Sequence, residues 1–265
     1  MFAATLIYTA VVQTTGLLIV GHGLVRVQPI VALIAVVGLI GGPVAVVGSV
    51  LGYAGFQIAQ GVFPVWQGAT YLVFGLLIHV FRIQSGLTEI RNPLGSITQF
   101  AVFSLVVCLS AFGTASFMSW NYMLVGRFPF FPGVFFSGLS LAVSAMLGGV
   151  LALSFVQRLV SSQRWQSVTR FLRTGDCRQS GTRSWLLISL GLLFAWVVAG
   201  SVISIGFQIF ELLPPNVIGR RGYESILIFA ETGRFSDADY ALQFAIGMTI
   251  ITLWLASLRR YRVFS

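Results

Sequence analysis

The chain has 265 residues, of which 57% are hydrophobic and 9% are charged, and it carries a formal net charge of +9. Its mean hydropathy of +0.91 is outside the usual range of soluble globular domains. All sixteen Lys and Arg residues are arginine, which excludes a retinal protein that needs a buried lysine for its Schiff base. Nucleic-acid binding is also disfavoured, because a basic hydrophobic chain usually carries its charge in cytoplasmic loops.

Continuous apolar runs predict an all-α polytopic transmembrane bundle of about seven helices. A hydrocarbon core of ~30 Å requires roughly 20 apolar residues per helix, and only helices or closed barrels satisfy their backbone groups in lipid. The runs do not alternate as barrel strands do. We therefore expect one integral domain over 1–265 in the cell membrane, with helices near 2–21, 29–56, 66–81, 94–117, 133–157, 184–210 and 240–258.

The first apolar run is interpreted as a retained helix, because it has no basic leader and no small-residue cleavage site. The arginines predict the orientation of the bundle. Twelve of the sixteen, beginning with Arg26 and Arg82, fall in connections that share one side of the membrane. The positive-inside rule therefore places the N-terminus outside and the C-terminus inside.

Two connections have a character of their own. Residues 158–173 alternate apolar side chains with arginines, a pattern that favours an amphipathic helix in the headgroup layer. Two other interpretations stay open, an extension of the fifth helix and a docking site for a soluble partner. Residues 211–239 contain five of the seven acids and are expected to form an external loop.

The second apolar run is rich in glycine and contains Pro43 near its middle. The proline removes a backbone donor and is expected to kink or break the helix, while Gly48 and Gly52 allow close approach of a neighbouring helix. Packing explains the pattern most simply. The alternative is a broken helix that exposes backbone polar groups to a central cavity.

A short motif occurs twice, at residues 61–68 and again 65 residues later at 126–133, as G-x-F-P-x-aromatic-x-G. Both copies precede a predicted helix on the predicted outer side, where the aromatic residues anchor the interface. Two similar interfacial turns, or a paired lid over an outward-facing site, would each produce this pattern. If a ligand site exists, its predicted lining consists of aromatic and amide side chains beside the turns: Gln57, Gln60, Trp66, Trp120, Asn121 and Phe131.

No constellation of catalytic residues is found, so an enzyme is disfavoured. The chain has two cysteines and two histidines, too few for a closed zinc site, and we expect no metal and no cofactor. A haem held by His22 and His79 is conceivable but has no other support.

Within residues 27–82, the segments 29–33, 38–43, 48–53 and 71–75, together with Gly61, form a pattern of glycine, proline and aromatics. This pattern resembles the membrane core of the substrate-binding (S) components of energy-coupling-factor transporters. The resemblance implies a compact helical bundle with an outward-opening small-molecule site, coupled to a transmembrane partner and cytoplasmic ATPases. The family usually has six helices, and its alanine pair in the first helix is absent here.

The sequence therefore predicts a small-molecule-binding membrane subunit of S-component type. The alternative is a non-catalytic accessory or structural subunit of a larger membrane protein complex, for which the 23 phenylalanines and six tryptophans offer a contact surface. In either case we expect membrane lipids and other membrane subunits as partners, and no nucleic acid.

Overall fold

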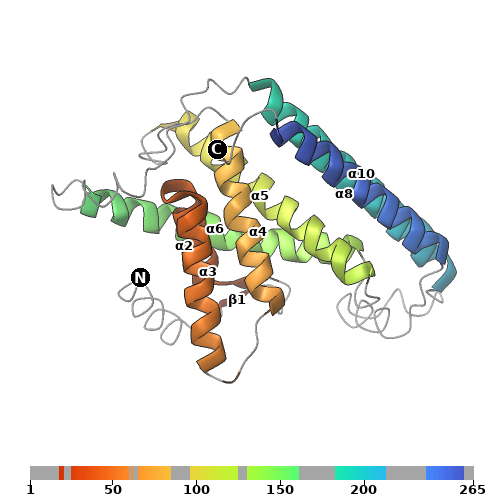
Figure 1. Cartoon of the computed structure of the whole chain (residues 1–265), viewed down its shortest axis with the longest axis horizontal. Coiled ribbons are helices and arrows are strands. Elements are labelled where there is room, and N and C mark those ends of the chain that lie inside the picture. The colour runs from red at the N-terminus through yellow and green to blue at the C-terminus, as the bar shows by residue number, and fades with distance from the viewer. Residues whose placement is uncertain are drawn as a thin grey trace. The chain divides into compact units, whose positions relative to one another are not determined.

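The computed structural model shows a predominantly helical protein (Figure 1). It describes residues 18–20, 25–59, 61, 65–84, 96–124, 130–160, 183–212 and 237–259. In these ranges a two-stranded antiparallel hairpin is followed by seven helices, which confirms the all-α class. The elements are β1 Leu18–Val20, β2 Val25–Val27, α2 Pro29–Ile40, α3 Gly42–Ala59, α4 Val65–Gln84, α5 Ile97–Leu124, α6 Phe130–Val160, α8 Arg183–Leu212 and α10 Asp237–Arg259.

Three of these helices are long and apolar enough to cross a membrane: α3, α5 and the Phe130–Leu151 part of α6. Shorter apolar stretches of 10–17 residues occupy Pro29–Ile40, Leu187–Ile203 and Tyr240–Ala256. The chain is therefore a helical membrane protein. The total of seven crossings and the direction of the termini stay predictions.

The chain divides into two compact units. Unit 1 comprises Met1–Thr114 and Leu139–Leu186, and unit 2 comprises Ala115–Gly138 and Leu187–Ser265. The divisions fall inside α5, α6 and α8, so that each of these helices contributes residues to both units.

The last five predicted helices are all found, with ends that differ by a few residues. The largest difference is in α5, which continues to Leu124 rather than ending near residue 117. The predicted interfacial helix at 158–173 begins inside α6, which ends at Val160, and its other residues lie outside the described part. The predicted external loop at 211–239 overlaps the end of α8 and the start of α10, and residues 213–236 are likewise outside.

The prediction of a first helix at 2–21 is wrong for residues 18–20. Leu18–Val20 form a strand that pairs with Val25–Val27, with Ile19 opposite Arg26. The intervening sequence contains Gly21 and Gly23, and such glycines between short β-branched runs favour a hairpin. Residues 2–17 lie outside the described part of the chain.

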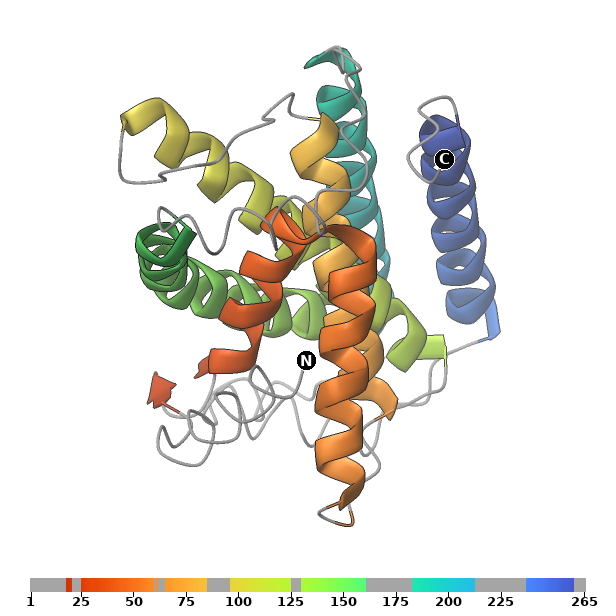
Figure 2. The ribbon, with the colours of Figure 1, turned by 60° about the vertical axis from the view of Figure 1, so that its left-hand side comes forward.

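The second predicted helix, at 29–56, is two helices rather than one. α2 ends at Ile40, and α3 begins at Gly42, whose φ of +71° is a left-handed value that favours glycine. Pro43 follows directly, and its ring would clash with the carbonyl group four residues earlier in a continuous helix. The predicted break at Pro43 is confirmed, but the chain reverses there, so that α3 runs back beside α2 (Figure 2).

Close packing of α2, α3 and α4 depends on Gly38, one of the glycines of the predicted second helix, and on Gly75 of α4. A Cβ on Gly38 would lie 2.7 Å from the carbonyl oxygen of Gly75, which brings α2 and α4 together. A Cβ on Gly75 would lie 2.6 Å from Val46 and 3.0 Å from Ile34. The predicted contact at Gly48 is wrong, because a Cβ there would meet nothing within 4 Å.

In unit 1, α2 also packs against α6. A Cβ on Gly148 of α6 would clash with the side chain of Ala32, and the backbone N–H of Gln28 donates to Ser144 Oγ at 3.0 Å. A Cβ on Gly149 would lie 3.3 Å from the ring of Phe103 in α5. These contacts place the start of α2 against α6, and α6 against α5.

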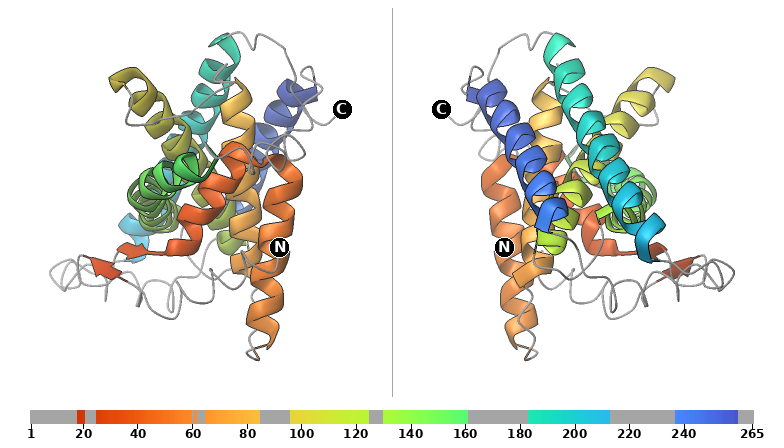
Figure 3. Two further views of the ribbon diagram at one scale, coloured as in Figure 1. Left: turned by 90° about the vertical axis from the view of Figure 1, so that its left-hand side faces the viewer. Right: turned by 90° about the vertical axis from the view of Figure 1, so that its right-hand side faces the viewer.

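Unit 2 is organised by α8 and α10, which run antiparallel (Figure 3). The Trp254 indole donates to Ser189 Oγ at 3.3 Å near one end of the pair, and Gln243 Nε2 donates to the Gly200 carbonyl at 2.8 Å farther along. A Cβ on Gly200 would clash with the ring of Phe130, from the start of α6, so only glycine fits at this position. Polar links within an apolar helix pair fix the register of the two helices.

Candidate functional site

The predicted site residues fall in different units. In unit 1, Gln57 is half-buried near the end of α3 and Trp66 is exposed at the start of α4, while Gln60 lies outside the described residues. Trp120 and Asn121 of α5 and Phe131 of α6 belong to unit 2. The central residues of both F-P turns are also outside the described ranges, so the paired lid stays a prediction.

The three predicted residues in unit 2 have local partners. Trp120 is buried, and its indole donates to the Gln243 backbone carbonyl at 2.8 Å. The Asn121 amide donates to the Phe117 carbonyl one turn earlier, at 2.7 Å. The ring of Phe131 stacks on Phe135, with centroids 6.3 Å apart. Asn121 is therefore satisfied by its own helix, which weakens its case as a ligand contact.

Unit 1 contains a hydrogen-bonded group that we call the tyrosine–glutamine cluster. Tyr53 Oη donates to Gln67 Oε1 at 2.5 Å, and Tyr71 Oη donates to Gln28 Oε1 at 2.7 Å. The two tyrosine rings meet edge to face with centroids 5.0 Å apart. Ser144 completes the group by accepting from the Gln28 backbone. Polar residues from α3, α4, α6 and the start of α2 thus converge on one place.

Helical spacing explains how the sequence builds this cluster. Tyr53 and Gln57 are four residues apart on α3, and Gln67 and Tyr71 are four apart on α4, so each pair occupies one helix face. Because α3 and α4 are antiparallel neighbours, the two faces meet near the connection (Figure 1). Sequence reasoning named Gln57, one turn after Tyr53, but missed the glutamines and tyrosines of the cluster itself. The i,i+4 spacing of a tyrosine and a glutamine on each helix was the available signal.

The cluster leaves hydrogen-bond donors available. A carboxamide has one oxygen acceptor and two N–H donors. The oxygens of Gln28 and Gln67 both accept from tyrosine, which turns their NH2 groups away from the tyrosines. Within the described residues neither NH2 group has a protein acceptor. The arrangement therefore presents two amide donors beside aromatic rings.

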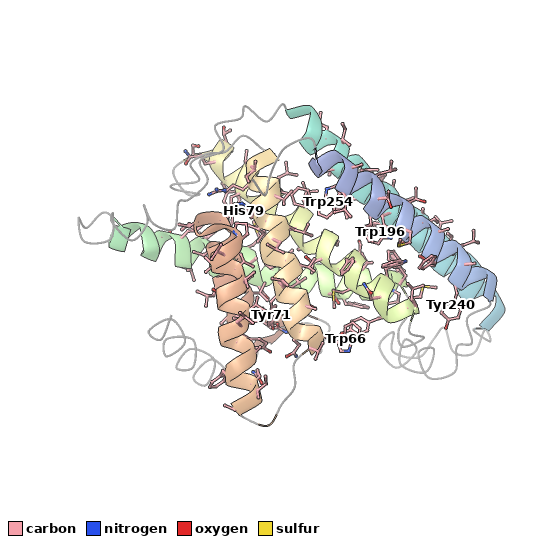
Figure 4. The ribbon with its side chains drawn as sticks, in the orientation of Figure 1. Trp66, Tyr71, His79, Trp196, Tyr240 and Trp254 are labelled. Atoms are coloured by element: carbon pink, nitrogen blue, oxygen red, sulfur yellow. The ribbon has the colours of Figure 1, made fainter. Side chains whose placement is uncertain are left out.

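A second polar group lies at the α2–α3 turn, at the other end of α4. The Arg82 guanidinium donates to the Leu39 carbonyl, where the negative end of the α2 dipole favours a cation. His79 is buried, and its imidazole lies against Gly42, as its position near the turn in Figure 4 shows. Arg82 thus caps α2, so α4 holds both ends of this short helix.

The geometry also shows which way α2 points. Its start is bonded to Tyr71 and its end to Arg82, so α2 is parallel to α4. Arg26 lies two residues before the Gln28 cap of α2, and therefore away from the end of α2 that bonds to Arg82. The side of the membrane on which each arginine lies stays a prediction.

Comparison with models of protein families, with curated proteins and with solved structures finds no match. Among the residues that the structure describes, no group of three His, Cys, Asp or Glu side chains could hold a metal ion.

Proposed function

We propose that the protein is a membrane subunit that binds a small, uncharged molecule at the tyrosine–glutamine cluster. The observation that carries the proposal is the position of this cluster at the start of a helix that is too short to cross the membrane. Broken helices that end at buried polar groups are typical of binding sites in transporters. The resemblance to S components supports the same class of function.

The depth of the cluster follows from helix lengths. α2 has 12 residues and is about 18 Å long, against a hydrocarbon core of about 30 Å. Its end lies beside Arg82 at the end of α4, a position suited to the membrane surface. Its start lies beside Tyr71, which is about 9 Å into α4 from the opposite end. The cluster is then reached from the side of the membrane opposite to Arg82.

The cluster also indicates a chemical class of ligand. Its available groups are amide donors, its walls are aromatic, and the described part of unit 1 contains no acidic residue. A neutral molecule with carbonyl or ether oxygens can accept from the amide groups and stack on the aromatic rings. A cation would find no carboxylate there, and we therefore propose an uncharged ligand with oxygen acceptors.

Native mass spectrometry of the protein purified in mild detergent tests this function. The wild type should retain one small molecule. Gln67→Glu keeps an oxygen for Tyr53 but replaces the amide donors, so ligand retention should fall by roughly tenfold, the equivalent of one lost hydrogen bond. Because residue 67 is exposed, the melting temperature should change little.

The matched control is Thr70→Val, which lies on the same helix and whose hydroxyl donates only to its own helix at the Trp66 carbonyl. This variant should retain the ligand. Equal retention in Gln67→Glu and the wild type would refute the site. A wild type that carries no small molecule but co-purifies with other membrane proteins would instead support an accessory subunit.

A further inference from the structure

Unit 2 contains a second buried polar centre that is separate from the tyrosine–glutamine cluster. Gln243 of α10 is fully buried, with 0% of its surface exposed. Its side-chain N–H donates to the Gly200 carbonyl of α8, and its backbone carbonyl accepts from Trp120 of α5, both at 2.8 Å. One residue thus links three helices of unit 2.

Two polar atoms of this centre have no hydrogen-bond partner among the described residues. They are Gln243 Oε1, an acceptor, and the indole Nε1 of Trp196, a donor whose residue is only 5% exposed. Burial without a partner is costly, and buried polar atoms are nearly always satisfied by protein or by another molecule. The amide cannot be turned around, because the Gly200 carbonyl accepts only from its N–H group.

The donor and the acceptor belong to one cluster. The Trp120 ring lies 6.1 Å from the Trp196 ring, and the Trp120 indole is bonded to the backbone of Gln243. Gly200, the partner of the Gln243 amide, is one helical turn after Trp196 on α8. Figure 4 shows Trp196 beside the α8–α10 pair.

The hydroxyl of Ser201 is also buried without a partner in the described part of the chain, but it does not need a bound molecule to satisfy it. A serine hydroxyl rotates freely and is able to bond to the carbonyl one turn earlier on its own helix. The indole N–H and the amide oxygen have no such local alternative.

We propose that this centre binds one hydroxyl group, which accepts from Trp196 Nε1 and donates to Gln243 Oε1. A hydroxyl is the smallest uncharged group that satisfies both atoms at once. The walls are aromatic, because Trp120 packs on Phe244 with centroids 6.3 Å apart. Phe244 is 51% exposed, so this wall reaches the surface of unit 2. The hydroxyl belongs either to a buried water or to a lipid-soluble alcohol.

Ultraviolet resonance Raman spectroscopy tests the proposal, because the indole bands report whether the N–H is hydrogen-bonded. The difference between the wild type and Trp196→Phe isolates the Trp196 signal, and phenylalanine keeps an aromatic ring in place. The expected Trp196 signal is that of a hydrogen-bonded indole. The control is Trp254→Phe, since Trp254 has a protein acceptor in Ser189.

The probe 1-hexanol separates the two sources. If the hydroxyl comes from an alcohol, 1-hexanol should shift the Trp196 signal and bind roughly tenfold more weakly to Trp196→Phe. If it comes from water, the signal should be hydrogen-bonded before 1-hexanol is added and unchanged afterwards. A Trp196 signal typical of a free indole, both without and with 1-hexanol, would overturn the proposal. This outcome does not depend on ligand retention in unit 1.

Discussion

A methyl group at residue 75 should be far more costly than one at residue 48, although both positions are glycines of the same unit. A Cβ on Gly75 would be 2.6 Å from Val46 and 3.0 Å from Ile34, whereas ordinary carbon contacts are about 3.5–4.0 Å. Val46 and Ile34 are β-branched and stiff at χ1, so they cannot rotate away freely. At Gly48 the same methyl group would meet nothing within 4 Å.

Comparison of Gly75→Ala with Gly48→Ala isolates this overlap. Both substitutions replace a helical glycine by alanine, so the gain in helix propensity is similar and cancels. The remaining difference is the cost of overpacking, about 1–3 kcal/mol. We expect Gly75→Ala to be less stable than Gly48→Ala by that amount in chemical unfolding of the purified protein, measured in one detergent. Equal stabilities would show that α2, α3 and α4 do not approach each other as described.

Two further predictions concern the stability of α2 and the orientation of the chain in the membrane. Arg82→Gln should destabilise the protein by about 1–2 kcal/mol in thermal unfolding, because it removes the charge that caps α2; an unchanged melting temperature would show that this cap contributes nothing. Single cysteines at Ser180 and Ser236, in a background without Cys108 and Cys177, should show the predicted topology in intact cells. A membrane-impermeant reagent should label position 236 and not position 180. The reverse result would show that the orientation of the bundle in the membrane is opposite to the predicted one.

The positions of most helices could be predicted from the sequence, because long apolar runs have few alternatives in lipid. The reversal at Gly41 could be predicted only in part. Pro43 indicates a break, but the angle depends on the left-handed backbone of Gly42 and on contacts with α4. A run of apolar residues has the same composition whether it crosses once or turns back.

The candidate site was harder to predict than the fold. Tyr53 and Tyr71 are ordinary core residues by sequence alone, and their hydrogen bonds join residues 14 and 43 positions apart. Such pairings depend on which helices become neighbours, and periodicity does not contain that information. Gln57 was recognised because it borders an aromatic turn, whereas Gln28 sits at a helix start created by the unforeseen arrangement of α2.

The attachment of α2 at both ends to α4 has a consequence for biogenesis. While the chain is being synthesised, α2 leaves the ribosome before the residues that bond to its two ends, since Tyr71 and Arg82 both follow 43 residues after their partners. Until α4 arrives, the polar start and the terminal carbonyl groups of α2 would be unsatisfied in lipid. Stable integration of α2 must therefore wait for α4, so this short helix reaches its final depth only after two later helices, α3 and α4, have been synthesised.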